Sequence, residues 1–261
     1  MQNMDIKLVV TDLDRTLLHT DKTLSAYTVE VLNRCREKGV KLAFATARPF
    51  CNGSQYGILP FAERLAALPD ALITSNGAEV YIGRRRHKHF PIAPGLRDTT
   101  LRLLKQAKPE GFIFVEIGEE IYGNVPGAVH GDFTKLPDEA ANMIFIGVDS
   151  TAEVHALAPL LHEDLYIEMS HGEEHHLGLI LHKTAGKWTG VKEAARFFNI
   201  LVENIAVFGD DFIDLEMIKN AGVGVAVENA APEVKKVARF VCGSNNEDGV
   251  ARWLEEHIVC R

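Results

Sequence analysis

The chain has 261 residues, 46% of them hydrophobic and 25% charged, and 36 acidic against 28 basic residues give a formal charge of −8. This composition excludes a disordered chain, a collagen and a disulfide scaffold, and the acidic balance argues against a generally basic nucleic-acid binder. The four cysteines form no CxxC pair, the amino terminus shows no secretory signal, and no apolar run is long enough to cross a membrane. We therefore expect a cytoplasmic protein of one large or two small domains.

The first part of the chain alternates between short apolar runs and a helical pattern. Residues 6–10, 40–45 and 71–74 are apolar runs too short for helices and typical of strands buried on both faces. Ser25 is a candidate N-cap for a helix that ends at Gly39, between the first two runs. The order strand, helix, strand predicts parallel pairing through right-handed crossovers.

The middle of the chain has runs of adjacent strands instead. Residues 79–82 and 89–92 flank Gly-Arg-Arg-Arg-His-Lys, which indicates a hairpin with an exposed basic tip. Two helices and further strands follow it, a pattern typical of a separate α+β module. Alternation returns near the carboxyl terminus, so we predict an α/β domain built from residues 1–80 and 185–261, with an α+β domain inserted at 81–184.

The strongest chemical signal stands at the end of the first predicted strand, in Val-Val-Thr-Asp-Leu-Asp-Arg-Thr-Leu. Asp12 and Asp14 follow this strand directly, and ligand sites of open α/β sheets lie at the carboxyl ends of strands. Two acids crowded at one strand end repel each other, and a bound divalent cation would relieve that repulsion. The alternative is an acidic turn in which Thr16 bonds locally.

Further polar residues stand at or just past other predicted strands or helix starts: Thr46, Lys187, Asp210, Asp211 and Asp214. Each alone is a weak signal, because a solvated lysine or an acidic turn would look the same. Together they provide a carboxylate nucleophile, a carboxylic acid, a hydroxyl donor, an ammonium and ligands for a hard cation, which is a set suited to phosphoryl transfer.

In this order the motifs resemble those of the Cof-like phosphatases of the haloacid dehalogenase (HAD) superfamily, with a type IIB cap. Residues 12–16 resemble the first motif, 45–49 the second, Lys187 the third and 209–214 the fourth. The resemblance covers nearly the whole chain. It implies a three-layer, Rossmann-like core with a parallel sheet and an inserted α+β cap of the C2B type.

The resemblance also implies catalytic roles. Asp12 would attack phosphorus and become an aspartyl phosphate, and Asp14 would protonate the departing alkoxide and then deprotonate the attacking water. Thr46 and Lys187 would bind phosphoryl oxygens. Three further residues are expected as possible substrate contacts: Arg48, Asn76 and Asn229.

Magnesium is the cofactor that the resemblance implies. The Asp12 carboxylate, the Asp14 main-chain carbonyl and Asp210 would hold it, while Asp211 and Asp214 would support it from behind.

The chain departs from the family pattern at two site positions. Arg15 stands where the family usually has glycine, which permits unusual backbone angles, and Ile213 replaces an asparagine that could hydrogen-bond. His171, His175 and His176 invite a zinc interpretation, but they lie between two predicted strands, so we favour a solvated cap loop.

The sequence thus favours a Mg²⁺-dependent phosphatase that hydrolyses small phosphate monoesters, with sugar phosphates as the leading class. A phosphomutase with the same motifs, a non-catalytic ligand-binding relative and a signalling module with a phosphorylated aspartate remain as alternatives. We expect a small phosphorylated metabolite as the partner and neither nucleic acid nor membrane, and we leave the oligomeric state open.

Overall fold

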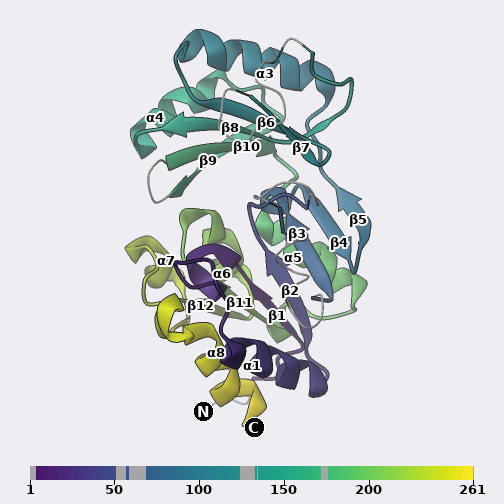
Figure 1. The fold of residues 1–261 in the computed structure, drawn as a ribbon, viewed down its shortest axis with the longest axis vertical. Helices are drawn as coiled ribbons and strands as arrows, with labels where there is room; N and C mark the ends of the chain where they lie inside the picture. Colours follow the sequence, from purple (N-terminus) through teal and green to yellow (C-terminus); the bar gives the residue numbers. More distant parts are fainter. Residues whose placement is uncertain are drawn as a thin grey trace.

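The structure is a computed structural model that describes residues 4–50, 57–58, 69–123, 133, 135–171 and 176–260. An eight-stranded sheet with helices packed around it forms one end of the molecule, and a five-stranded sheet covered by two helices forms the other (Figure 1). Both termini lie at the end far from the smaller sheet. Within the described residues, no helix has both the length and the apolar character that crossing a bilayer requires.

The eight-stranded sheet has the order β13-β12-β11-β1-β2-β3-β4-β5. Its strands are β1 (Leu8–Thr11), β2 (Lys41–Ala45), β3 (Ala71–Thr74), β4 (Glu79–Ile82), β5 (Arg85–His89), β11 (Ile205–Gly209), β12 (Val223–Ala226) and β13 (Phe240–Val241). All pairs from β13 to β3 are parallel, whereas β4 and β5 continue the sheet antiparallel. Because β1 lies between β2 and β11, the residues that follow these three strands meet at one edge of the sheet.

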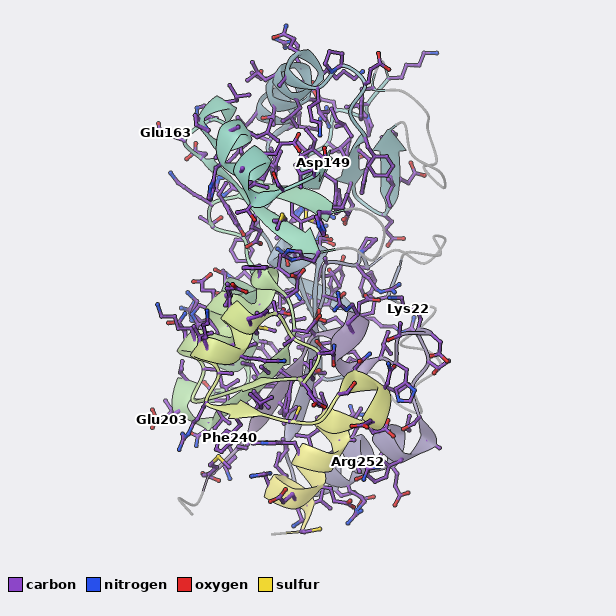
Figure 2. All side chains as sticks on the ribbon, turned by 90° about the vertical axis from the view of Figure 1, so that its left-hand side faces the viewer. Lys22, Asp149, Glu163, Glu203, Phe240 and Arg252 are labelled. Carbon is purple, nitrogen blue, oxygen red and sulfur yellow. The ribbon has the colours of Figure 1, made fainter. Side chains whose placement is uncertain are left out.

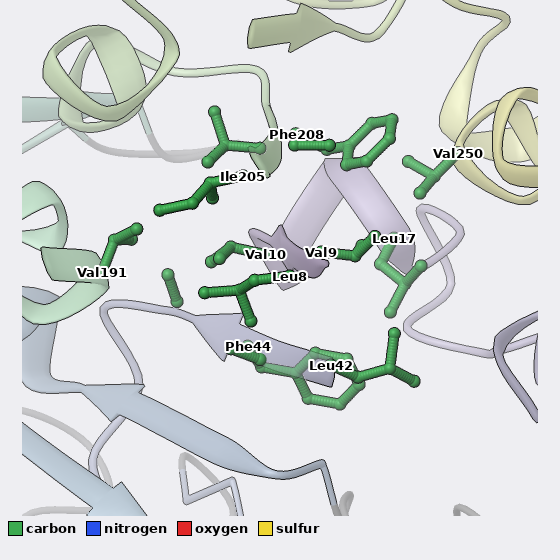
Figure 3. Packing of buried hydrophobic residues seen from close by; sticks show 14 of the residues in the cluster. Leu8, Val9, Val10, Leu17, Leu42, Phe44, Val191, Ile205, Phe208 and Val250 are labelled. Carbon is green, nitrogen blue, oxygen red and sulfur yellow. The ribbon is translucent and has the colours of Figure 1, made fainter. Parts of the chain in front are cut away.

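Strand β1 is buried throughout because both of its faces are covered. The helices around this sheet are α1 (Ala26–Glu37), α5 (Lys187–Phe197), α6 (Leu215–Asn220), α7 (Pro232–Val237) and α8 (Gly249–Leu254). Val191 of α5 and Val250 of α8 lie on opposite sides of β1, and Leu8 and Val9 fill the space between (Figure 3). Ser25 caps α1 as predicted, since its side chain accepts a hydrogen bond from the Thr28 N–H.

The smaller sheet is antiparallel, with the order β7-β6-β8-β10-β9. Its strands are β6 (Ile113–Ile117), β7 (Glu120–Gly123), β8 (Ala141–Val148), β9 (Leu165–His171) and β10 (His176–His182), and its helices are α3 (Pro94–Ala107) and α4 (Thr151–Leu157). Ile144 and Ile146 of β8 pack in the cluster that includes the helices, whereas Met143 and Phe145 pack with Ile213 from the other part of the molecule. This alternation is the two-residue period of a strand buried on both faces.

The α/β fold with a large parallel sheet is confirmed, and one detail of the hairpin is wrong. The basic tract predicted as a hairpin tip mostly belongs to β5, an exposed strand at the edge of the large sheet. Strands β4 and β5 therefore extend the large sheet instead of starting the inserted module. The domain boundaries at residues 81 and 184 stay a prediction, and we use "cap" below for residues 113–182, which contain the smaller sheet.

Candidate active site

Three carboxylates meet at the edge where β1 and β11 end. Asp12 follows β1, Asp210 follows β11, and Asp214 ends the short helical turn Phe212–Asp214. Each offers an oxygen within 4.8 Å of the others, and all three residues are buried. They come together because β1 and β11 pair in register, with Thr11 opposite Phe208. The predicted convergence of the first and fourth motifs is present in the structure.

Lys187 lies inside this group of acids. It is the first residue of α5, and its Nζ donates to Asp12 Oδ1 and to Asp214 Oδ1, at 2.6 Å in each case. Burial alone would lower the pKa of Lys187, but the charges of Asp12 and Asp214 raise it above its usual range, so the ammonium persists. Burial raises the pKa of Asp12, and repulsion by Asp214 and Asp210 adds to the rise against the pull of Lys187.

Asp210 has weaker partners than Asp12. The Thr16 hydroxyl donates to Asp210 Oδ1 at 2.8 Å, and Arg15 Nε lies 3.7 Å from Oδ2. Burial, followed by repulsion from Asp214, raises the pKa of Asp210 to about 7. The other oxygen of Asp214 accepts from the Asp210 N–H at 3.0 Å, so Asp214 also fixes the backbone of this loop.

The three acids suit a hard divalent cation. Carboxylate oxygens are the ligands that Mg²⁺ takes from proteins, and here three of them are buried within reach of a single ion. Only one ammonium, from Lys187, contacts the group at hydrogen-bond distance among the described residues. The negative charge is therefore not fully offset by the protein, and the site fits a metal.

Asp14 has a different environment although it is two residues from Asp12. Arg48 donates two hydrogen bonds to the Asp14 carboxylate, from Nε to Oδ2 and from Nη2 to Oδ1, both at 2.7 Å. Lys22 Nζ lies 3.3 Å from Oδ1. Burial would raise the pKa of Asp14, but the hydrogen bonds and charges of Arg48 and Lys22 lower it. Lys22 lies in the large-sheet part of the molecule, toward the end that faces the cap (Figure 2).

A cavity of about 210 Å³ joins these groups to the cap. It is lined by residues from the large-sheet part and from β9: Asp12, Asp14, Arg15, Lys22, Thr46, Ala47, Ser170, His171, Asp210, Asp211, Ile213 and Asp214. Thr46, which follows β2, is held there by its backbone N–H bond to the Ile73 carbonyl. The predicted nucleophile, acid, hydroxyl donor and Asp210 thus share one small cavity.

The structure corrects our expectation for His171 and shows a further contact of Asp211, whose support of the metal stays a prediction. Asp211 Oδ2 accepts from the Ser170 hydroxyl at 3.0 Å and from the His171 N–H at 2.8 Å. His171 Nδ1 lies 2.7 Å from Asp211 Oδ1, so this histidine of the cap contacts the large-sheet part instead of lying in a solvated loop. The His176 ring lies 4.8 Å from the His171 ring, and His175 lies outside the described residues.

The three expected substrate contacts all have partners in the protein. Arg48 binds Asp14. Asn76 is fully buried and its amide donates to Glu168 of β9, while Asn229 donates to the Arg15 carbonyl at 2.7 Å. Neither asparagine lines the cavity around Asp12, so the structure gives each of them a role in joining segments.

The chain matches the family model of haloacid dehalogenase-like hydrolases over residues 9–254. It belongs to this family. Pyridoxal phosphate phosphatase YbhA of Escherichia coli is 28% identical, with 98% of this chain and 100% of that protein covered. The Bacillus subtilis 5-amino-6-(5-phospho-D-ribitylamino)uracil phosphatase YitU is 25% identical, with 96% and 97% covered.

Solved structures agree with the fold. BT1666 from Bacteroides thetaiotaomicron, a phosphatase of the HAD superfamily, matches with a TM-score of 0.82 at 23% identity, covering 97% of this chain and 96% of that one. The HAD subclass IIB sugar phosphatase BT4131 matches with a TM-score of 0.79 at 22% identity, covering 96% and 98%. The predicted superfamily, its hydrolase class and the Rossmann-like core with a cap are confirmed.

Both departures from the HAD family pattern have structural explanations. Arg15 keeps a left-handed backbone (φ 63°), which glycine adopts at lower cost, and its guanidinium comes near Asp210. Ile213 packs against Met143 and Phe145 of the cap, so an apolar contact stands where the family has a polar side chain.

Sequence reasoning missed several residues of the site. Thr16 was weighed only as a locally bonding residue, although its place in the first HAD motif could have indicated the bond to Asp210. Lys22 and Ser170 carry no such signal, because they reach the cavity from a loop and a cap strand whose direction no motif determines. His171 was singled out for a possible zinc site, not as a residue of this cavity.

Proposed function

We propose that the protein is a Mg²⁺-dependent phosphatase that hydrolyses small phosphate monoesters through a phosphorylated Asp12. The observation that carries this proposal is the placement of Asp12 at a cavity shared with Asp14 and Thr46, bonded to Lys187 and within reach of Asp210. The relatives named above act on small phosphorylated molecules, which supports a metabolite as substrate, and a sugar phosphate is the class we favour.

In the first step an Asp12 oxygen attacks phosphorus, and the bond between phosphorus and the ester oxygen breaks. The departing alkoxide takes a proton from Asp14. In the second step a water molecule attacks the aspartyl phosphate, gives a proton to Asp14 and releases inorganic phosphate, which restores the Asp12 carboxylate and the protonated form of Asp14. Asp14 starts the second step ionised, and its contact with Arg48 favours that form.

Lys187 and Thr46 serve the phosphoryl group. Lys187 holds Asp12 in place and presents positive charge where the phosphoryl oxygens would lie, and the Thr46 hydroxyl adds a neutral donor at the same cavity. Asp12, the Asp14 carbonyl and Asp210 would hold Mg²⁺, with Asp214 close behind. When bound, the ion would offset the carboxylate charge and polarise a phosphoryl oxygen.

The cap closes the other side of the cavity. Ser170 and His171 line it from β9, so they face the organic part of a bound ester. Their bonds to Asp211 hold the cap against the loop that carries Asp210. A closed cap of this kind keeps bulk water from the phosphoryl group during the first step.

Asp12→Asn tests the proposal. Release of inorganic phosphate from p-nitrophenyl phosphate should fall by at least about 1000-fold, because an amide is a poor nucleophile. Asp5→Asn, which changes an exposed acid, is the matched control and should hydrolyse the ester normally. EDTA should stop the wild-type reaction and Mg²⁺ should restore it.

Substantial turnover by Asp12→Asn would contradict the nucleophile assignment. A wild-type protein that converts one hexose phosphate into its isomer without releasing phosphate would contradict hydrolysis and favour a phosphomutase.

A further inference from the structure

The turn that follows β3 has an unusual backbone. Ser75, Asn76 and Gly77 have φ values of 49°, 52° and 91°, so three successive residues lie in the left-handed region. Residues with a side chain pay a cost there, and such a conformation persists only where its surroundings determine it. The surroundings of this turn are two loops of the active site and the cap.

The backbone of the turn contacts both phosphate-binding segments. The Asn76 N–H donates to the Thr46 carbonyl at 3.0 Å, and the Ser75 N–H donates to the Arg48 carbonyl at 2.9 Å. Gly77 lies directly on the backbone of Gly186, because a Cβ added to Gly77 would lie 2.1 Å from the Gly186 oxygen. The same added Cβ would lie 2.7 Å from the Lys187 nitrogen, so any shift of the turn displaces one or both segments.

The side chains of the turn contact the cap. The Ser75 hydroxyl donates to Glu116 Oε1 on β6 at 2.5 Å, and the Asn76 amide donates to Glu168 Oε1 on β9. Strand β9 also reaches the second segment, since the Tyr166 hydroxyl donates to the Ala185 carbonyl at 3.3 Å. Two successive residues thus bind two different cap carboxylates, while their backbone binds the loop of Thr46.

We propose that the Ser75–Gly77 turn couples the seating of the cap to the phosphate-binding residues, and that Asn76 and Glu168 are positioning residues for Thr46 and Lys187. The position of the cap determines where the side chains of the turn lie. The backbone of the turn positions the segments that carry Thr46 and Lys187. This inference rests on the proposed function only in taking Thr46 and Lys187 as the groups that bind phosphate.

Asn76→Asp is the most direct test. Aspartate has the size of asparagine and tolerates the left-handed region, but it places an oxygen against Glu168 where an N–H donor stood. The readout is the inhibition constant of inorganic phosphate, whose recognition by Thr46 and Lys187 requires no cap residue. We expect phosphate to bind about tenfold or more weakly, the change that loss of one charge-assisted hydrogen bond produces.

Glu168→Gln supplies the rescue. Alone, it keeps an oxygen that accepts from Asn76 but removes the negative charge, so phosphate affinity should fall by less than it does in Asn76→Asp. Combined with Asn76→Asp, it exchanges the amide and the carboxylate, so that the new amide at position 168 donates to the new carboxylate at position 76. The double variant should recover most of the lost phosphate affinity.

Two results would overturn the inference. One is an unchanged inhibition constant for phosphate in Asn76→Asp with a raised KM for the ester, which would mean that the turn only docks the cap. The other is a double variant no better than Asn76→Asp. If Asn76→Asp does not fold, Asn76→Gly, which removes the side chain and favours the same φ, gives the same test. A wild-type protein that does not bind inorganic phosphate would instead contradict the proposed function.

Discussion

Two groups of buried acids in this molecule are held in opposite ways. At the sheet edge, Asp12, Asp210 and Asp214 crowd one another, and one ammonium, that of Lys187, binds Asp12 and Asp214. Between the turn and the cap, Glu116 and Glu168 are each bound by neutral donors, which for Glu116 are the Ser75 hydroxyl and the Asn142 amide at 2.7 Å.

The difference shows what each group is suited to bind. Burial raises the pKa of Asp12 and Asp210 in the first group and of both glutamates in the second, but for Asp210 repulsion by a neighbouring carboxylate is the next largest cause. A cation relieves that repulsion directly. For Glu116 the donors oppose the effect of burial, and the pKa still reaches about 8, so a proton is what satisfies this group. One group is therefore suited to cation and phosphoryl chemistry, and the other to joining two parts of the chain.

Removing the shared ammonium should break the first group. In Lys187→Met, the buried acids Asp12 and Asp214 lose the ammonium that binds them, so we expect phosphate release to fall about 100- to 1000-fold and unfolding free energy at neutral pH to fall by about 3–5 kcal/mol. Lys192→Met changes an exposed lysine of the same helix and should shift stability by less than about 0.5 kcal/mol. Urea unfolding and initial rates measure both effects, and an unchanged stability of Lys187→Met would contradict the account of this group.

Asp210→Asn tests whether the acids at the sheet edge bind a metal ion. Mg²⁺ at about 100 times its Kd should stabilise the wild-type protein by about 2.7 kcal/mol, whereas the variant should lose most of this effect. Without Mg²⁺ the variant should unfold at a higher temperature than the wild type above pH 7, because a repelling charge has been removed. Since protons compete with the metal, wild-type stabilisation by Mg²⁺ should shrink as the pH falls through about 7.

Asp211→Asn is the matched control for this measurement, because that carboxylate binds Ser170 and His171 of the cap. Thermal unfolding with and without Mg²⁺ compares the three proteins. Equal stabilisation of Asp210→Asn and the wild type by Mg²⁺ would remove Asp210 from the metal site.

The first group could be predicted from the sequence and the second could not. The apolar runs before Asp12 and Asp210 predict buried parallel strands, and parallel strands that lie side by side bring the residues after them to one edge. The order of the HAD motifs added Lys187. These signals depend on local patterns and on a general rule of sheet topology.

Contacts between the cap and the active-site loops follow no such rule. Asn76 was named only as a possible substrate contact, because a motif gives the position of a residue but not the direction of its side chain after a turn with positive φ. Its partner Glu168 stands in an ordinary strand pattern that indicates no contact with the turn. Asp211 was assigned to the metal because its motif, too, gives no direction for its side chain. Only the folded arrangement of the two sheets determines which of these carboxylates binds which donor.

Glu116→Gln separates the two groups of acids by the pH dependence of the protein's stability. The pKa of Glu116 is about 8 in the folded protein against 4.5 ordinarily, so between these values the folded state holds the extra proton. Its contribution to stability is complete below about pH 4.5 and is lost as the pH rises through about 8, at a slope of at most about 1.4 kcal/mol per pH unit. The variant lacks this loss, so its stability relative to the wild type should improve steadily from about pH 5 to about pH 8.

Urea unfolding across this range measures the difference, with Glu119→Gln on the exposed turn after the same strand as the control. Parallel curves for Glu116→Gln and the wild type would mean that Glu116 is ionised against the turn, and the contrast with the sheet-edge acids would then fail.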